Sequence, residues 1–204
     1  MSFALTLPAM PHRIERRGFG PSEGSMSAYF LIVVAVLTRV IPHSWLNFTA
    51  VGGSLLFFGA RRPLRQAIWP LLALMGTDYY LTVYAYNYPF HAGSYVVTWT
   101  WYAAVIVLGN ILLAKKLSAG RVAGAVVLAS TSFFVVSNYA VWISSAASLY
   151  PHTLAGLTAC YTAALPFYRN DLLSTSLVAG LAFGLPALAR RLASQHETHG
   201  NAAV

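Results

Sequence analysis

The distribution of charged residues constrains this chain more than any other feature of its sequence. Of 204 residues, 13 are Lys or Arg and 5 are Asp or Glu, and four stretches contain none of them: 40–60, 79–114, 122–168 and 172–189. Roughly 20 apolar helical residues cross a hydrocarbon core about 30 Å thick. Backbone groups in lipid must be paired within the protein, and these stretches lack the alternation of a β-barrel. We therefore expect an all-α polytopic membrane bundle embedded in the lipid bilayer.

Turn residues and charge clusters divide these stretches into helices. The expected spans cover residues 28–41, 48–60, 63–84, 95–114, 122–145 and 172–189. Residues 153–168 are mostly apolar and fit a short re-entrant helix, an interfacial helix or a seventh span. Asn170 and Asp171 have side chains suited to capping the last helix. The expected architecture is six transmembrane helices plus a short re-entrant or interfacial helix.

Basic residues predict the orientation of the bundle, because Lys and Arg gather in cytoplasmic loops. Six spans with a cytoplasmic amino terminus place 11 of the 13 basic residues inside, and a seventh span places 10 inside. We expect flexible cytoplasmic tails at 1–27 and 192–204 on either side of a single transmembrane domain at 28–191. The net charge of +8 lies at helix ends rather than on one face, so it does not indicate a nucleic acid partner.

Two charged residues stand inside apolar helices, in the outer third of the expected bundle. Arg39 and Asp78 are the exceptions to the rule that charges mark helix ends. A charge at the centre of a membrane helix costs about 2.5–3.5 kcal/mol and usually faces a partner or a cavity. The pair is either a salt bridge that fixes helix packing or part of an outward-facing pocket that holds a polar or zwitterionic ligand. The sequence leaves both interpretations open.

Aromatic and polar residues of the same region extend the candidate site. Belts of Trp and Tyr mark both faces of a membrane, whereas four of the five Trp here fall on the expected outer side. This asymmetry favours a ligand-facing pocket, with an interfacial belt or core packing as the alternatives. The candidate solute-binding residues are Arg39, His43, Asn47, Asp78, Tyr79, His91, Trp101, Asn138 and Trp142.

The sequence gives little indication of catalysis or of a bound cofactor. The single cysteine, Cys160, excludes an internal disulfide and a Cys-based zinc cluster. Nothing in the spacing of His43, His91 and His152 demands a metal, and no nucleophile elbow, phosphate loop or paired-carboxylate motif is present. We expect no enzyme activity, no cofactor and no metal site. A membrane enzyme that uses Cys160 or the histidines is the third hypothesis.

Three segments carry a resemblance to a bacterial membrane family. They are TRVIPHSWLNFTAVGGSLLFFGA (38–60), LLALMGTDYYL (71–81) and SNYAVWISSAASLYPHTLAGLTACYTAALPFYRNDLLSTSLVAGLAFG (137–184). On these segments the chain resembles domain of unknown function 6580, whose members are described as transport proteins. That family is similar to the six-helix substrate-binding (S) components of energy-coupling-factor vitamin transporters. The resemblance implies the bacterial inner (cytoplasmic) membrane and a ligand pocket on its outer side.

The chain departs from this resemblance at two places. Substrate-binding components of this type commonly dock through an Ala-xxx-Ala surface on the first helix, but here Ala35 is followed four residues later by Arg39. Energising transporter subunits, self-association and solitary facilitation therefore all stay open. The family also has an acid near the start of the last helix, where this chain has Thr175, and Asp171 lies one turn earlier on the same face.

These observations lead to two hypotheses of function. The leading one is a membrane protein that binds a small polar or vitamin-like solute in an outward-facing pocket and mediates its uptake. The alternative is a non-transporting structural or accessory subunit of a membrane complex. A dry, closed pair of Arg39 and Asp78 favours the alternative, whereas a cavity beside the pair favours solute binding.

Overall fold

The computed structural model describes residues 23–41 and 48–201, and this part of the chain is helical and contains no strand. Its α-helices are α1 (Glu23–Val40), α2 (Val51–Arg61), α3 (Ile68–Tyr80), α4 (Val96–Leu113), α5 (Ala119–Ser144) and α6 (Leu154–Asn201). A π-helical turn, Leu81–Ala85, extends α3, and a 3-10 turn, Ala92–Tyr95, precedes α4. The expected all-α fold is thus confirmed for the described residues.

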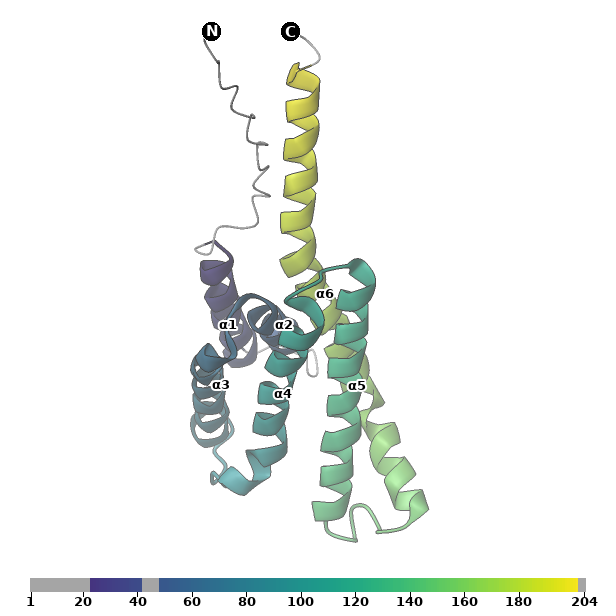
Figure 1. Cartoon of the computed structure of the whole chain (residues 1–204). Helices are drawn as coiled ribbons and strands as arrows, with labels where there is room; N and C mark the ends of the chain where they lie inside the picture. Colours follow the sequence, from purple (N-terminus) through teal and green to yellow (C-terminus); the bar gives the residue numbers. More distant parts are fainter. Residues whose placement is uncertain (1–22, 42–47, 202–204) are drawn as a thin grey trace, which may run out of the picture.

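The short helix α2 lies at the centre of the fold, in contact with α1, α4 and α6 (Figure 1). Every residue from Val51 to Gly59 is buried. Glycines allow its backbone to lie against α4: a Cβ on Gly59 would lie 1.9 Å from the Ile106 carbonyl oxygen, and one on Gly109 would lie 2.3 Å from that of Leu56. Residues 51–60 of the charge-free stretch therefore form a packed core helix.

Within the described part of the chain, three helical segments are long and apolar enough to cross a membrane: Ala92–Leu113, Ala119–Ser144 and Leu154–Ala193. The apolar part of α1, Ser25–Val40, is shorter, and the 11 residues of α2 extend only about 17 Å. The expectation of six full spans plus an extra helix is therefore wrong. The short apolar runs explain the wrong prediction, because about a dozen apolar residues are too few for a full span and are typical of a helix buried in a protein core.

Residues 153–168 do not form a separate re-entrant or interfacial helix. They begin α6, which continues without a break through Pro166 and Pro186 to Asn201 (Figure 1). A proline leaves a backbone carbonyl of the helix without its hydrogen-bond donor. In a membrane helix, neighbouring groups can supply another donor, so proline need not end the helix. Asn170 and Asp171 lie inside α6 and cap nothing. Residues 192–201, expected as tail, are helical, and α1 already begins at Glu23.

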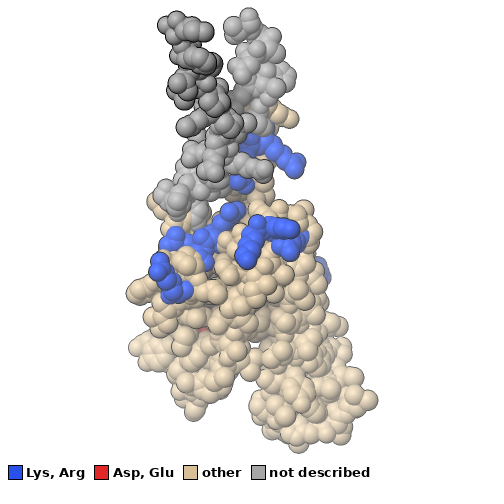
Figure 2. Space-filling view, viewed as in Figure 1, with Lys and Arg blue, Asp and Glu red and all other residues tan. Residues whose placement is uncertain are grey.

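Basic side chains gather at one end of the molecule. In the face that Figure 2 shows, Lys and Arg form a band near the α2–α3 and α4–α5 connections and along the adjoining part of α6. The described members of this basic end are Arg61, Arg62, Arg65, Lys115, Lys116, Arg121, Arg190 and Arg191. The connections 81–95 and 145–153 lie at the opposite end (Figure 1).

Candidate functional site

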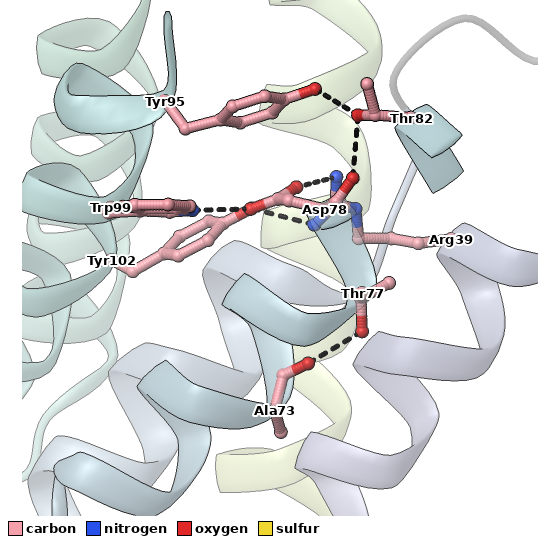
Figure 3. Close-up of polar contacts among 8 residues, drawn as sticks. All are labelled: Arg39, Ala73, Thr77, Asp78, Thr82, Tyr95, Trp99 and Tyr102. Carbon is pink, nitrogen blue, oxygen red and sulfur yellow. Dashed lines mark hydrogen bonds and ion pairs between the residues drawn. The ribbon is translucent and has the colours of Figure 1, made fainter. Parts of the chain in front are cut away.

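Arg39 and Asp78 meet in the structure. Arg39 lies in the last turn of α1, Asp78 lies near the end of α3, and the Arg39 Nη2 donates to Asp78 Oδ1 at 2.6 Å (Figure 3). The Asp78 side chain is 1% exposed and the Arg39 side chain is 19% exposed. The two exceptional charges thus neutralise one another across α1 and α3.

Two side chains of α4 complete this contact (Figure 3). Trp99 Nε1 donates to Asp78 Oδ2 at 2.9 Å, and the Tyr102 hydroxyl lies 3.4 Å from the same oxygen. Arg39 Nη1 donates to the Tyr102 hydroxyl at 2.8 Å. Both carboxylate oxygens are therefore occupied by donors, and the four side chains join α1, α3 and α4. We call Arg39, Asp78, Trp99 and Tyr102 the charge network.

Aromatic rings cover the charge network on the side of the 81–95 connection. Thr82, in the π-helical turn, donates to the Asp78 carbonyl at 2.7 Å and is hydrogen-bonded to the Tyr95 hydroxyl (Figure 3). The rings of Phe90, Tyr95 and Trp99 stack, with centroids 5.3 Å apart for Phe90 and Tyr95 and 5.8 Å apart for Tyr95 and Trp99. This stack shields the ion pair, which strengthens its electrostatic attraction.

The geometry favours helix packing as the role of the ion pair. Both carboxylate oxygens of Asp78 already accept hydrogen bonds, its side chain is only 1% exposed, and three of the cavities among the described residues are lined by neither Arg39 nor Asp78. Sequence reasoning did not include Trp99 or Tyr102 in the site. Trp99 follows Tyr95 by four residues, and Tyr102 follows Trp99 by three, so all three lie on one helix face. This spacing is the sequence pattern that could have identified them as part of the site.

The other predicted residues of this half do not converge on the charge network. Tyr79 is exposed and its ring contacts Phe90 edge to face, with centroids 5.1 Å apart. His91 is exposed, and its Nδ1 lies 3.2 Å from the Pro89 carbonyl oxygen. His43 and Asn47 lie outside the described residues.

A cavity of about 340 Å³ lies between α5 and α6, near the connection that joins them. Its polar lining consists of Ser130, Ser137, Asn138, Tyr150, Tyr168 and Asp171, and aromatic rings of Phe133, Phe134 and Phe167 form much of the remaining wall. Asn138 is the predicted site residue that lines this cavity. The single thiol, Cys160, also lines it, and its Sγ lies 3.5 Å from the Asn138 carbonyl oxygen. We call this space the α5–α6 cavity.

Two predicted tryptophans support the α5–α6 cavity from outside. Trp101 is buried, donates from Nε1 to the Ala129 carbonyl at 3.1 Å and packs on Phe133, with ring centroids 4.4 Å apart. Trp142 donates to the Pro151 carbonyl at 3.1 Å, next to Tyr150 in the α5–α6 connection. These two residues position the wall and the mouth of the cavity.

Asp171 is the most unusual group in the α5–α6 cavity. It is only 7% exposed, yet its Oδ2 has no hydrogen-bond partner among the described residues. Ser130 on α5 is close enough to interact with this carboxylate and is its available donor within the protein, although neither the Ser130 Oγ nor the Asp171 Oδ2 completes a hydrogen bond among the described residues. Most buried polar atoms in proteins are hydrogen-bonded, so an orphaned carboxylate oxygen needs an explanation. The sequence places Asp171 one turn before the position of the family's acid and also suggests a helix cap, and Asp171 is not among the predicted binding residues.

Comparison with known proteins identifies one family. Among curated proteins no match is found, and among solved structures none is found either. The family model described as "Family of unknown function (DUF6580)" matches residues 22–197, which include every described helix except the last few residues of α6. The expected membership is thereby confirmed: the chain belongs to the family DUF6580.

Proposed function

We propose that this protein binds a small polar or vitamin-like solute in the α5–α6 cavity and mediates its uptake across the bacterial cytoplasmic membrane. The observation that carries the proposal is the buried, unpartnered Oδ2 of Asp171 at the cavity wall. An unsatisfied buried polar group costs about 1–3 kcal/mol, and more when it is charged. A solute that donates a hydrogen bond to Asp171 would offset that cost.

The charge distribution supports an outward-facing cavity. The cavity residues of α5 and α6 lie toward the 145–153 connection, at the opposite end from the basic residues in Figure 2. Because Lys and Arg gather on the cytoplasmic side, the basic end and both termini are placed inside in this proposal. The α5–α6 cavity then faces the outer side, where an uptake protein must meet its solute.

In this proposal the predicted residues have different roles. Asn138 contacts solute, and Trp101 and Trp142 shape the cavity from behind. Arg39 and Asp78 hold three helices together through the charge network and do not contact solute. The protein is not proposed to be an enzyme or to carry a cofactor.

The second candidate function is that of a subunit in a larger membrane complex, and the closed ion pair of Arg39 and Asp78 favours it. Gly120 and Gly124 on α5 and Gly180 and Gly184 on α6 leave open space, since a Cβ at any of them would meet nothing within 4 Å. Small residues of this kind allow membrane helices to approach closely. Such a surface suits a second copy or an energising subunit, and it lies on α5 and α6 rather than on the first helix, where substrate-binding components of energy-coupling-factor transporters commonly dock. Solute binding and subunit docking are compatible, because they use opposite halves of α5 and α6.

A cavity-filling substitution tests the solute-binding proposal. The full-length protein in lipid nanodiscs is screened for thermal stabilisation by a panel of vitamins, nucleobases and small amines. Ala163→Phe fills the α5–α6 cavity, and Ala159→Phe is the matched control because Ala159 is exposed on the same helix and does not line the cavity. A solute at 100 times its Kd adds about 2.7 kcal/mol of stability.

The expected result is that a panel solute raises the melting temperature of the wild type and of Ala159→Phe by roughly 5–10 °C. The same solute should leave Ala163→Phe unchanged, and its uptake into proteoliposomes should fail for that variant alone. Equal stabilisation of both variants would place the solute elsewhere. No stabilisation by any solute would favour the accessory-subunit function.

A further inference from the structure

We infer that the solute of the α5–α6 cavity is an organic cation, with a quaternary or protonated nitrogen, and that Asp171 is its counter-ion. The inference rests on the proposed function, since it names the chemical class that this cavity accepts. Three features of the lining carry it: an unpaired acid with no basic side chain beside it, oxygen atoms that can accept hydrogen bonds, and a wall of aromatic rings.

The first feature is the charge state of the cavity wall. Asp171 is an acid, and none of the 13 lining residues is Lys, Arg or His. Among the described residues the recorded ion pair is that of Arg39 and Asp78, and Asp171 takes no part in it. A carboxylate this deeply buried in a membrane protein normally faces a partner or a cavity. Here it faces a cavity, and a positively charged occupant would supply the partner that the described residues do not.

The second feature is the kind of hydrogen-bonding atom that the wall offers. Asn138 Nδ2 already donates to the Phe134 carbonyl at 2.7 Å, which leaves the side-chain oxygen of Asn138 for a ligand. The Tyr168 hydroxyl is shared with Thr131 at 3.0 Å. Together with Asp171 Oδ2, this oxygen gives the wall two atoms that can accept hydrogen bonds, beside hydroxyls such as that of Ser130 that can also donate. The two oxygens suit the N–H groups of an ammonium ion, and an ionised Asp171 repels a carboxylate or phosphate.

The third feature is the aromatic wall. Phe133, Phe134, Phe167 and Tyr168 line the cavity, and the rings of Phe134 and Tyr168 lie 4.7 Å apart. The face of an aromatic ring attracts cations, and this attraction grows when the cation is removed from water. Rings and one carboxylate together form a site for a nitrogen cation. The cavity volume of about 340 Å³ lies at the lower end of the range of roughly 300–1,000 Å³ that is usual for small-molecule sites.

The test compares a cation with its uncharged isostere. Choline and 3,3-dimethylbutan-1-ol have nearly the same shape, but only choline carries a charge. Binding to the full-length protein in nanodiscs is followed by thermal shift and by the rate at which N-ethylmaleimide alkylates Cys160, the only cysteine of the chain. Because Cys160 lines the cavity, protection of its thiol locates the bound compound.

Choline is expected to bind at least tenfold more tightly than the alcohol and to slow alkylation of Cys160 in proportion to its occupancy. Asp171→Asn should remove this preference while the variant stays folded, because the substitution replaces an unpaired buried acid with an amide of the same shape. The melting temperature of Asp171→Asn without ligand verifies folding. Asp171→Glu keeps the charge and should retain a preference for choline.

The outcomes separate the inference from the function on which it rests. If a neutral or acidic panel solute binds, protects Cys160 and binds equally well to Asp171→Asn, the cation inference is overturned and the solute-binding function stands. If choline and the alcohol bind equally, the inference is also overturned. If no cationic, neutral or acidic compound shifts the melting temperature or protects Cys160, the proposed function fails and the inference fails with it.

Discussion

Breaking the ion pair of Arg39 and Asp78 should destabilise the protein more when one charge is removed than when both are removed. In Asp78→Ala the Arg39 guanidinium, 19% exposed, loses the carboxylate that lies 2.6 Å from its Nη2. The same change leaves the Trp99 N–H without its acceptor. Removing one partner of a buried pair typically costs about 3–5 kcal/mol, because the other charge stays buried and unpaired. Partial exposure of Arg39 to water points to the lower half of that range.

The double variant Arg39→Met with Asp78→Leu removes both charges and keeps most of the side-chain volume. Replacing a buried ion pair with apolar groups of similar size is often neutral or stabilising. In this variant the Trp99 N–H loses its acceptor and the Tyr102 hydroxyl loses its donor. Each lost hydrogen bond should lower the free energy of unfolding by about 1 kcal/mol. The double variant should therefore be at least about 1 kcal/mol more stable than Asp78→Ala. The single variants Arg39→Met and Asp78→Leu complete the cycle, and the coupling energy between them should be about 2 kcal/mol or more.

Thermal unfolding in nanodiscs, followed by near-ultraviolet circular dichroism, measures these differences. For a chain of this length each kcal/mol corresponds to roughly 2–4 °C, so Asp78→Ala should lower the melting temperature by roughly 6–15 °C. Arg65→Ala is the control, because Arg65 is an exposed member of the basic end, and it should change the melting temperature by less than about 2 °C. Single variants as stable as wild type, or a double variant that shows the summed loss of both singles, would refute the role of the charge network.

Three further predictions follow from packing and hydrogen bonding. Trp99→Phe removes the indole donor to Asp78 Oδ2 and should cost about 1.5–3 kcal/mol, measured by the same unfolding assay. Gly59→Ala should prevent stable folding, because its Cβ would lie 1.9 Å from a carbonyl oxygen of α4, whereas Gly124→Ala meets nothing within 4 Å and should stabilise by about 0.5–1 kcal/mol. Trp142→Phe loses the bond to the Pro151 carbonyl and should speed proteolysis of the α5–α6 connection by about two- to tenfold, with α-helix content unchanged.

Charge clusters allowed the sequence to place the middle helices accurately. Residues 95–114 were expected as a span and α4 covers Val96–Leu113, because Lys115 and Lys116 mark the point where the chain leaves the apolar region. For α2 the same pattern was misleading. An apolar run of this length can cross lipid or fill a protein core, and the neighbouring helices decide between the two. Glycines let α2 pack closely against α4, but their positions in the sequence do not identify the helix against which they pack.

Short-range sequence patterns also gave a wrong prediction inside α6, near Pro166. Pro166 followed by Asn170 and Asp171 has the pattern of one helix that ends and another that is capped. In the structure the helix continues and Asp171 turns toward the α5–α6 cavity. No local rule distinguishes a cap from a buried acid inside a helix, because the difference lies in Ser130 and the aromatic residues that α5 brings alongside.

The two buried acids, Asp78 and Asp171, show why pairing matters more than the presence of a charge. Both lie in apolar helices and both are at least nine-tenths buried. Asp78 receives donors on both oxygens from α1 and α4, so a ligand would have to break existing bonds to reach it. Asp171 has an oxygen that no described group satisfies, at the wall of a cavity large enough for a small solute. The satisfied acid therefore stabilises the fold, and the unsatisfied acid is the one at which a solute can gain free energy by binding.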